Sequence, residues 1–482
     1  MTASLDEYDV ILTINNDISV CASHNQEFLS TLWQSLRFRD RNYFHNRRYK
    51  QKLWDGYIDF FNKTSGKFLT GLLPEVILVA KHHNLKVFYD DKRNKTSFAV
   101  QQIDKNYLKY NQPNLDLHDY QVDFVDQIIK HKRGVIYAPT SAGKSFIMVS
   151  IIKSLPPNTP ALVLQNRVGL ASQNYEEIKK WNIPNVGCLW GGKVEPNVIT
   201  VASVQSVPKL EKLLPKIKVL IVDEIHDMMS AGPKSVYKKL KQADIRVALS
   251  ATPFKFGEKD KVQKYNVKGF FGPVLKTNSV ESGILTTKEL QNRGILAASK
   301  GYFIPVDSPK LPYDIYLDAV TRGIAENSGF HEMVRKLALV QKGRTLILVD
   351  RIAHGDILHK MIPDSLWVQG KDNSETRSFV IKELQQNKND LIAIATQQIF
   401  NTGINVFLHQ LINAAGGQAD HQIIQRMGRG LRLASDKDEL KYFDFIFNIN
   451  PYLLEHSNKR IKILTEQGHI IKKLSFEEAL QV

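Results

Sequence analysis

The loop that joins two apolar runs within residues 133–155 constrains the fold more than any other feature of the sequence. The first run, RGVIYA (133–138), is short and rich in β-branched residues, which is typical of a buried strand. The second run, FIMVSIIKSL (146–155), is long enough for a buried helix. Between them, PTSAGKS (139–145) can direct backbone N–H groups and a helix N-terminus at one phosphate group. The segment predicts a phosphate-binding P-loop, with an ordinary strand–helix turn as the alternative.

The residue types of this loop assign a role to each position if ATP binds there. Lys144 is expected to reach the β- and γ-phosphates, and the Ser145 hydroxyl is expected to bind Mg²⁺. Ala138 stands where the strict pattern has glycine. The residues expected to surround the phosphates are Pro139, Thr140, Ser141, Ala142 and Gly143.

A carboxylate pair further along the chain fits the same site. Asp223 and Glu224 follow the apolar run KVLIV (218–222), at the carboxyl end of a predicted parallel strand, where α/β proteins form ligand sites. An aspartate there can bind Mg²⁺, and the adjacent glutamate can polarise the attacking water. An isolated pair would be read as a solvated helix start, but the P-loop upstream favours the catalytic interpretation.

Apolar runs alternate with charged, helical stretches in two successive blocks, which predicts two α/β units with parallel sheets covered on both faces. The runs are 133–138, 161–165, 197–203, 218–224 and 246–252, then 344–350, 365–370, 390–396, 410–415 and 442–448. We expect a small N-terminal α+β domain (1–112), two α/β domains (113–306 and 307–450) and a short helical C-terminal tail (451–482).

Further segments resemble the motifs of superfamily 2 helicases, in that family's order. The sequence LHDYQ (117–121) resembles the adenine-recognition motif, with Gln121 as the base reader. The sequence DEIH (223–226) fits the DExH type, and SAT (250–252) resembles the motif that couples hydrolysis to strand movement. The resemblance implies two RecA-like motor domains, the use of ATP and Mg²⁺, and a coupling role for His226, Ser250 and Thr252.

The same resemblance implies the contacts with nucleic acid. The sequences QNR (165–167) and SVQ (203–205) resemble first-domain motifs that touch the nucleic-acid backbone. The stretch 395–405 resembles the motif that lies between nucleotide and strand, so Gly403 is implied to contact the nucleotide. The residues implied to contact nucleic acid are Arg167, Ser203, Gln205 and Thr396.

The sequence QRMGRGLR (425–432) matches the arginine-finger motif of that family, which implies a catalytic role for Gln425, Arg429 and Arg432. Hydrolysis needs positive charge on the γ-phosphate as the transition state loosens, and these arginines can supply it. Because they lie in the second domain and Lys144 lies in the first, ATP could close the cleft between the domains and hydrolysis could release it.

The segment RFRDRNYFHNRRYKQK (37–52) is basic and interleaved with aromatic residues. Arginine can bind phosphate with two hydrogen bonds, and aromatic rings can stack on bases. The candidate phosphate-binding residues are Arg37, Arg39, Arg41, Arg47 and Arg48. The alternative is a charged helix face whose aromatic residues belong to the core.

Composition agrees with a nucleic-acid partner. The net charge is +16, and such an excess suits a polyanion because each neutralised phosphate releases a counterion. The two cysteines are too few for a disulfide framework or a four-ligand zinc site. No apolar run approaches the roughly 18 residues of a membrane span, and the first residues do not resemble a signal peptide. We therefore expect a soluble protein of the cytoplasm.

The arrangement of the chain also resembles the recombination helicases of tailed phages. That resemblance implies branched DNA as partner, namely forks, four-way junctions (Holliday junctions) and R-loops, and a role in recombination, repair and replication. It further implies a monomeric motor in a phage-infected bacterial cell, with other recombination proteins as possible partners. The alternatives are an RNA helicase, a double-strand translocase subunit of a restriction system, and an annealing protein whose ATP site only switches affinity.

Overall fold

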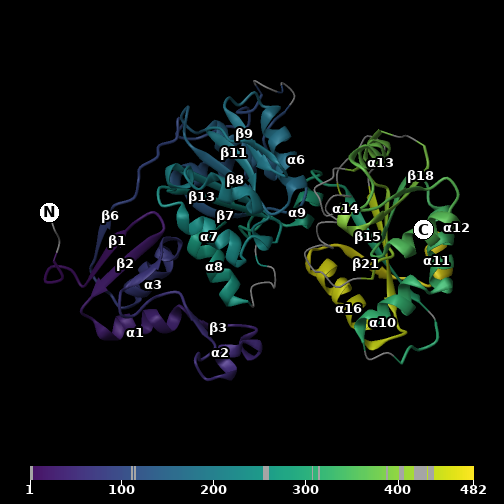
Figure 1. Ribbon diagram of the computed structural model, residues 1–482, viewed down its shortest axis with the longest axis horizontal. Helices are drawn as coiled ribbons and strands as arrows, with labels where there is room; N and C mark the ends of the chain where they lie inside the picture. The colour runs from purple at the N-terminus through teal and green to yellow at the C-terminus, as the bar shows by residue number, and fades with distance from the viewer. Residues whose placement is uncertain are drawn as a thin grey trace. The chain divides into compact units, whose positions relative to one another are not determined.

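The computed structural model describes residues 4–109, 112, 115–252, 254, 260–306, 308–312, 315–386, 389–400, 406–416, 431 and 439–482, without the side chains of residues 374, 398 and 400. The chain divides into two compact units (Figure 1). The first is Met1–Ala138 with Gly143–Ile284, and the second is Leu285–Val482 with Pro139–Ala142. Among the described residues, no helix combines the length and the apolar character that a membrane span needs.

The first unit begins with a small sheet of order β5-β2-β1-β6, in which β1 and β2 are antiparallel and β1 and β6 are parallel. Helices α1 and α3 pack against it through Phe28, Leu32 and Val76, which share a buried core with the strands. The elements are β1 (Val10–Ile14), β2 (Ile18–Ser23), α1 (Gln26–Ser35), β5 (Lys67–Leu69), α3 (Leu73–His82) and β6 (Val87–Asp91). The N-terminal region is therefore α+β, as predicted.

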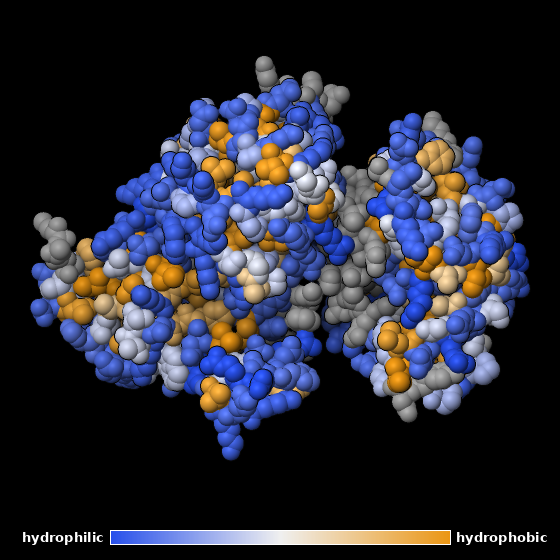
Figure 2. Space-filling view, viewed as in Figure 1, coloured by the Kyte–Doolittle hydropathy of each residue, from blue (hydrophilic) through white to orange (hydrophobic). Residues whose placement is uncertain are grey.

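The basic segment forms neither one helix nor one strand. It begins with β3 (Arg37–Arg39), which pairs with β4 (Tyr57–Asp59), and between them lie the 3₁₀ turn Tyr43–His45 and the short helix α2 (Arg47–Lys50). We call residues 37–59 the arm. Figure 2 shows the surface over β3 and α2 as mostly hydrophilic, with a small hydrophobic patch.

The N-terminal domain is joined firmly to the α/β part of the first unit. Lys268 of helix α8 (Lys261–Phe271) pairs with Glu75 of α3 at 2.7 Å. The Phe38 ring of the arm lies 4.4 Å, centroid to centroid, from the Tyr265 ring of α8. Gly71 approaches α8 so closely that a Cβ there would lie 2.0 Å from the Lys268 carbonyl oxygen. These contacts hold the N-terminal domain and the arm against helix α8.

The first large sheet has the order β10-β9-β11-β8-β12-β13-β7-β14, with all pairs parallel except β9 with β10. Its strands are β7 (Arg133–Tyr137), β8 (Ala161–Gln165), β9 (Val186–Trp190), β10 (Lys193–Glu195), β11 (Ile199–Ser203), β12 (Val219–Asp223), β13 (Ile245–Ser250) and β14 (Val274–Leu275). Its helices, besides α8, are α4 (Asp119–His131), α5 (Lys144–Lys153), α6 (Val168–Lys179) and α7 (Ala231–Lys239). The central strands are buried along almost their whole length because helices cover both faces, which is why their sequences are continuous apolar runs (Figure 1).

The second sheet has the order β17-β18-β16-β19-β20-β15-β21, and all its pairs are parallel. Its strands are β15 (Ala298–Val306), β16 (Arg344–Val349), β17 (Leu366–Val368), β18 (Leu391–Thr396), β19 (Gln410–Asn413), β20 (Glu439–Phe447) and β21 (Ile470–Lys473). The helices of this unit are α9 (Thr287–Asn292), α10 (Tyr316–Val320), α11 (Ser328–Val340), α12 (Ile352–Met361), α13 (Ser374–Gln386), α14 (Gln397–Phe400), α16 (Pro451–Glu466) and α17 (Phe476–Leu480). The predicted fold class, two RecA-like parallel-sheet domains, is confirmed.

Two predicted boundaries need correction. The boundary at residue 306 assigned β15 to the first domain, but β15 pairs with β20 and β21 of the second sheet. The segment 451–482 is not a separate helical tail, because β21 adds an edge strand to the second sheet and Leu453 of α16 lies in that unit's core. Strand partners distant in sequence decided both points, and the local pattern of residues does not record them.

Candidate nucleotide-binding and coupling site

The loop between β7 and α5 has a backbone suited to phosphate binding. Ser141 and Gly143 adopt left-handed conformations, with φ of +66° and +78°, so the chain turns sharply before α5 begins at Lys144. The Nζ of Lys144 lies 3.3 Å from the Ala138 carbonyl oxygen, so the ammonium group folds back over the loop. The Thr140 hydroxyl is buried and finds no hydrogen-bond partner in the part of the chain that the structure describes.

Gln121 of α4 lies against this loop, as its predicted role requires. A Cβ at Gly143 would stand 2.2 Å from Gln121 Nε2, so position 143 needs glycine for space as well as for its backbone conformation. The other end of the amide, Oε1, accepts a hydrogen bond from the His118 N–H at 2.9 Å and fixes the start of α4. Gln121 is only 2% exposed, so its orientation is set by the protein.

Asp223 lies at the carboxyl end of β12, close enough to the loop for its carboxylate to interact with Lys144. Its Oδ2 accepts hydrogen bonds from Gln165 at 3.2 Å and from Asn174 at 3.3 Å, and its Oδ1 accepts one from the Glu224 N–H. Desolvation raises the pKa of Asp223, the Glu224 carboxylate raises it further, and Lys144 and the two amides act in the opposite direction. A cation bound to this carboxylate would therefore offset the cost of desolvating its charge.

One member of this group, Asn174, is not indicated by any sequence motif. Asn174 lies in α6 and is 7% exposed, but in the sequence it is one polar residue among several on a helix. The sequence pattern places Gln165 in a nucleic-acid motif, and the structure shows its amide on Asp223 instead. The sequence around Gln165 and Asn174 does not indicate their contacts with Asp223. Both contacts form because β8 lies beside β12 in the sheet.

His226 joins the carboxylate pair to the segment 250–252. Its side chain is 1% exposed, and its Nδ1 lies 3.0 Å from the Ser250 hydroxyl and 3.3 Å from Glu224 Oε2. The Ser250 hydroxyl also accepts from the Thr252 N–H at 3.0 Å. The structure therefore brings together the three residues predicted to couple hydrolysis to movement. Glu224 itself has a left-handed backbone, with φ of +52°, which aims its side chain at this group.

The residues predicted to touch nucleic acid in the first unit divide into two groups. Gln205 is exposed and donates to the Asn166 carbonyl at 2.9 Å, so the segment 203–205 lies beside Arg167, which is partly exposed. Ser203, in contrast, is fully buried, and its hydroxyl bonds Ser206 at 3.0 Å. The Ser203 side chain is therefore not exposed in this structure, and its contact with nucleic acid stays a prediction.

The arm presents most of its predicted arginines but not all. Arg39, Arg41, Arg47 and Arg48 are exposed. Arg37 instead pairs with Asp55 and with Asp59, the latter at 3.3 Å, and stacks over the Trp33 and Tyr57 rings at 4.4 and 4.6 Å. The Arg37 guanidinium therefore already has two carboxylate partners and two aromatic neighbours in the folded arm, and phosphate binding by Arg37 stays a prediction.

In the second unit, Thr396 ends β18, is 5% exposed, and its buried hydroxyl finds no partner in the described part of the chain. Thr396 is therefore buried in this structure, and its contact with nucleic acid stays a prediction. The remaining predicted residues lie outside the described residues: Gly403, Gln425, Arg429 and Arg432.

The donor set fits a nucleoside triphosphate with Mg²⁺. The unpartnered Thr140 hydroxyl, the left-handed loop and the raised pKa of Asp223 each suit an added phosphate or cation. Lys144 would bind the terminal phosphates, while Ser145 and Asp223 would hold the Mg²⁺ ion.

The comparisons with known proteins agree with this reading. Residues 114–255 match the family described as "Type III restriction enzyme, res subunit". A solved structure of Mss116p bound to ssRNA and AMP-PNP has a similar fold, with a TM-score of 0.53 at 15% identity, covering 80% of each chain. Fold, site and family match together confirm the predicted resemblance to superfamily 2 helicases.

Among individual relatives, the chain resembles UvsW. It is 24% identical to the ATP-dependent DNA helicase uvsW of Enterobacteria phage T4 over 467 residues, which cover 88% of this chain and 91% of that protein. It is also 26% identical to the DNA 3'-5' translocase XPB2 of Sulfurisphaera tokodaii over 329 residues, which cover 66% of this chain and 69% of that protein.

Proposed function

We propose that this protein is an ATP-dependent DNA helicase of the DExH type that remodels branched DNA, including forks, four-way junctions and R-loops. The observation that carries the proposal is the buried contact of His226 with both Glu224 and Ser250. Through His226, Glu224, which is suited to activating water, is in contact with Ser250 of the segment that resembles the coupling motif. A change in the position of either residue would therefore affect the other. The names of the relatives, a DNA helicase and a DNA translocase, support DNA as the partner.

In this proposal, several residues of this chain have distinct roles in ATP binding and hydrolysis. Gln121 would read the base and Lys144 would hold the β- and γ-phosphates. Glu224 would orient the attacking water, and Arg429 and Arg432 would stabilise the charge that develops on the γ-phosphate, with Gln425 assisting. Mg²⁺ bound by Ser145 and Asp223 would neutralise phosphate charge. We place this activity in DNA recombination, repair and replication, in a phage-infected bacterial cell.

The test is ATP turnover measured with single-strand, duplex, forked and four-way DNA, and with RNA of the same sequences. We expect the highest turnover with forked or four-way DNA, and strand separation or branch migration that requires ATP. Equal or greater stimulation by RNA would contradict the proposal. Turnover without any dependence on nucleic acid would point to an ATP-switched binding protein.

A second candidate is translocation along duplex DNA without strand separation. The family match to a restriction-enzyme subunit and the similarity to a DNA translocase favour it. Displacement of a triplex-forming strand from linear duplex DNA, together with no unwinding of forks, would support this candidate over the first.

A further inference from the structure

The buried ring of His226 has a carboxylate near each of its two nitrogens. Asp227 Oδ2 lies 3.6 Å from Nε2, while Glu224 Oε2 lies 3.3 Å and the Ser250 hydroxyl 3.0 Å from Nδ1. The His226 side chain is only 1% exposed, so solvent screens these interactions weakly. At 3.6 Å, Asp227 is too far for a regular hydrogen bond and acts on the ring through its charge.

The backbone holds Asp227 in this place. Residues Ile225–Asp227 form a 3₁₀ turn directly after Glu224, and the Asp227 N–H donates to the Glu224 carbonyl at 3.1 Å. The next residue, Met228, donates its N–H to the Ile225 carbonyl at 2.9 Å, and its own carbonyl accepts from the buried Tyr237 hydroxyl at 2.9 Å. Both carboxylates and the imidazole therefore belong to one tightly bonded turn.

The two carboxylates compete for the same proton. A neutral imidazole carries one proton, on Nδ1 or on Nε2, and a carboxylate can only accept. A proton on Nδ1 is directed at Glu224 and Ser250, and it occupies a lone pair of the carboxylate that would orient the attacking water. A proton on Nε2 is directed at Asp227, and Nδ1 can then accept from the Ser250 hydroxyl, which otherwise donates to Glu224 at 3.4 Å. The two forms hold the same number of protons.

Asp227 also borders a polar cavity of about 310 Å³. Arm residues Asp40, Arg41 and Asn42 contribute to the lining of this cavity, together with His226. The Asp227 side chain is 23% exposed, so the cavity leaves room for a longer side chain at position 227.

We propose that Asp227 is a positioning residue for ATP hydrolysis. Its carboxylate draws the ring proton of His226 toward Nε2, so that Glu224 keeps a lone pair for the attacking water. Asp227 acts through His226 and not on the nucleotide. This inference rests on the proposed function, since it assumes that Glu224 orients the water.

The kinetic test is Asp227→Asn, which keeps the shape of the side chain and removes its charge. We expect kcat for ATP to fall by about tenfold to a hundredfold, at the lower end of the 10²–10⁴ that a general base contributes. The KM for ATP should stay within about twofold, because Lys144 and Asp223 are unchanged. Asp227→Glu keeps the charge and fits the cavity, so it should keep kcat within about threefold. Glu211→Gln, at an exposed carboxylate paired with Lys239, should leave both constants unchanged.

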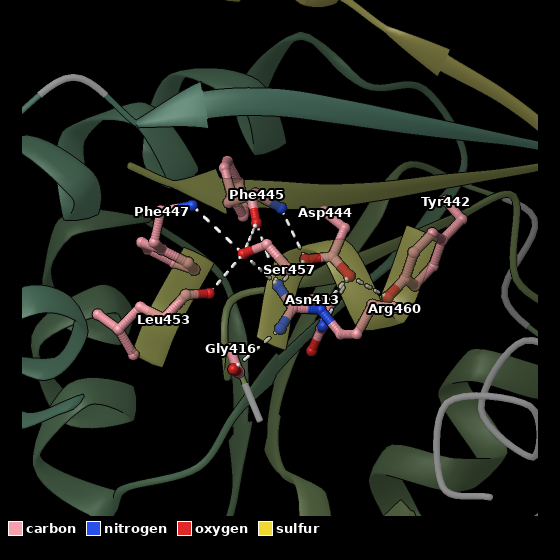
Figure 3. A network of polar contacts seen from close by, with 9 residues as sticks. All are labelled: Asn413, Gly416, Tyr442, Asp444, Phe445, Phe447, Leu453, Ser457 and Arg460. Carbon is pink, nitrogen blue, oxygen red and sulfur yellow. Dashed lines mark hydrogen bonds and ion pairs between the residues drawn. The ribbon is translucent and has the colours of Figure 1, made fainter. Parts of the chain in front are cut away.

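Nitrogen-15 NMR of histidine-labelled protein gives a readout that does not depend on turnover. The share of His226 with its proton on Nε2 should fall in Asp227→Asn and be kept in Asp227→Glu, with the signal assigned by its loss in His226→Gln. Asp444→Asn is the control for general destabilisation, since Asp444 is a buried carboxylate of the second unit, bound by Arg460 and the Tyr442 hydroxyl (Figure 3). It should lower thermal stability and leave the His226 signal unchanged.

A double-mutant cycle shows whether Asp227 acts through the ring. If it does, Asp227→Asn added to His226→Gln should lower kcat little further. The inference would be overturned by an equal fold-loss in both backgrounds, by a wild-type kcat for Asp227→Asn, or by an Nε2-protonated share that is the same in wild type and Asp227→Asn. A wild-type protein without ATP turnover would instead refute the proposed function, and the NMR comparison would still test the competition for the ring proton.

Discussion

The imidazole of His226 and the hydroxyl of Ser250 lie 3.0 Å apart, buried between the carboxylate pair and the segment 250–252. The same hydroxyl lies 3.4 Å from Glu224 Oε2. One serine side chain therefore touches both the residue suited to activating water and the histidine that follows it. A movement of Ser250, at the carboxyl end of β13, would therefore disturb the position of Glu224.

This contact predicts that Ser250→Ala combined with Thr252→Ala separates hydrolysis from strand movement. ATP turnover should remain within a few-fold of wild type, because Lys144, Asp223 and Glu224 stay in place. DNA unwinding should fall by roughly 5- to 150-fold, the range of an ordinary coupling free energy between sites. Both rates are measured on one forked substrate, with Ser235→Ala, at an exposed position of α7, as the control. Parallel loss of turnover and unwinding would assign Ser250 to catalysis instead.

Lys144→Ala should abolish ATP turnover and leave DNA binding largely intact. The ammonium group folds over the P-loop, with its Nζ 3.3 Å from the Ala138 carbonyl oxygen, and the substitution leaves the basic residues of the arm unchanged. Steady-state turnover and filter binding to duplex DNA are the two measurements, and Lys153→Ala at the far end of α5 serves as the control. Turnover within a few-fold of wild type would show that this loop is not the phosphate site.

Arg429→Ala and Glu224→Gln should each bind ATP and hydrolyse it slowly, for different reasons. An arginine finger contributes on the order of 10³–10⁵ in rate in related phosphoryl transfers. In Glu224→Gln, the new amide cannot polarise water but can keep the contact with His226, so the site should stay folded. Single-turnover hydrolysis and equilibrium binding of a fluorescent ATP analogue would distinguish the two steps. Loss of nucleotide affinity in either variant would give that residue a binding role.

The second unit should lose stability in mild acid because of a buried histidine. Burial, with the neighbouring His331, lowers the pKa of His354 to about 3. The unfolded chain takes up this proton below about pH 6.5, while the folded unit does not until about pH 3. The stabilisation is therefore complete above pH 6.5 and declines as the pH falls toward 3, by at most about 1.4 kcal/mol per pH unit. Hydrogen exchange in α11 and α12 at pH 7 and pH 5 measures it.

His354→Phe should reduce this difference between pH 7 and pH 5, because phenylalanine cannot take up the proton. His24→Gln, at an exposed position of the first unit, should leave the difference unchanged. An equal loss of protection in wild type and His354→Phe would mean that other groups govern the acid sensitivity.

The sequence was most informative where function depends on a contiguous segment. Strands β7 and β12, which precede the predicted P-loop and the carboxylate pair, lie in one parallel sheet with β13 between them, so their carboxyl ends lie at the same edge. Every predicted apolar run overlaps a strand, because both faces of each large sheet are covered. Short or edge strands such as β10, β14 and β21 carry no such pattern, since water or a single partner accepts their backbone groups.

Contacts between distant segments could not be predicted in this way. The run ASKGYFIPV (298–306) forms a strand that pairs with β20 on one side. On its other side it pairs with the run IIKK (470–473). The guanidinium of Arg37 looks free in the sequence, but Trp33, Asp55 and Tyr57 enclose it once β3 pairs with β4. Ser203 likewise matches a surface motif and is buried by its sheet. In each case the deciding neighbour is supplied by tertiary structure.

The exposed arginines of the arm should bind DNA phosphates, and Arg37 should not. The test is a variant with Arg39, Arg41, Arg47 and Arg48 all replaced by alanine, which leaves the Arg37 network and the Phe38–Tyr265 contact intact. The slope of log K against log salt should flatten by roughly 0.9 for each duplex phosphate that the variant no longer neutralises. Turnover of ATP without DNA should persist, because Lys144, Asp223 and Glu224 are unchanged, while affinity for forked DNA and unwinding both fall.

Two controls make this last prediction specific to the arm. A variant with four exposed lysines elsewhere replaced by alanine, Lys92, Lys180, Lys342 and Lys462, changes the net charge equally. It should weaken DNA binding slightly and leave the salt slope nearly unchanged, since charges that do not touch the DNA release no counterions. Circular dichroism must show that the arm variant is folded. If its salt slope matches that of the lysine variant, the arm is a solvated surface and not a DNA-binding element.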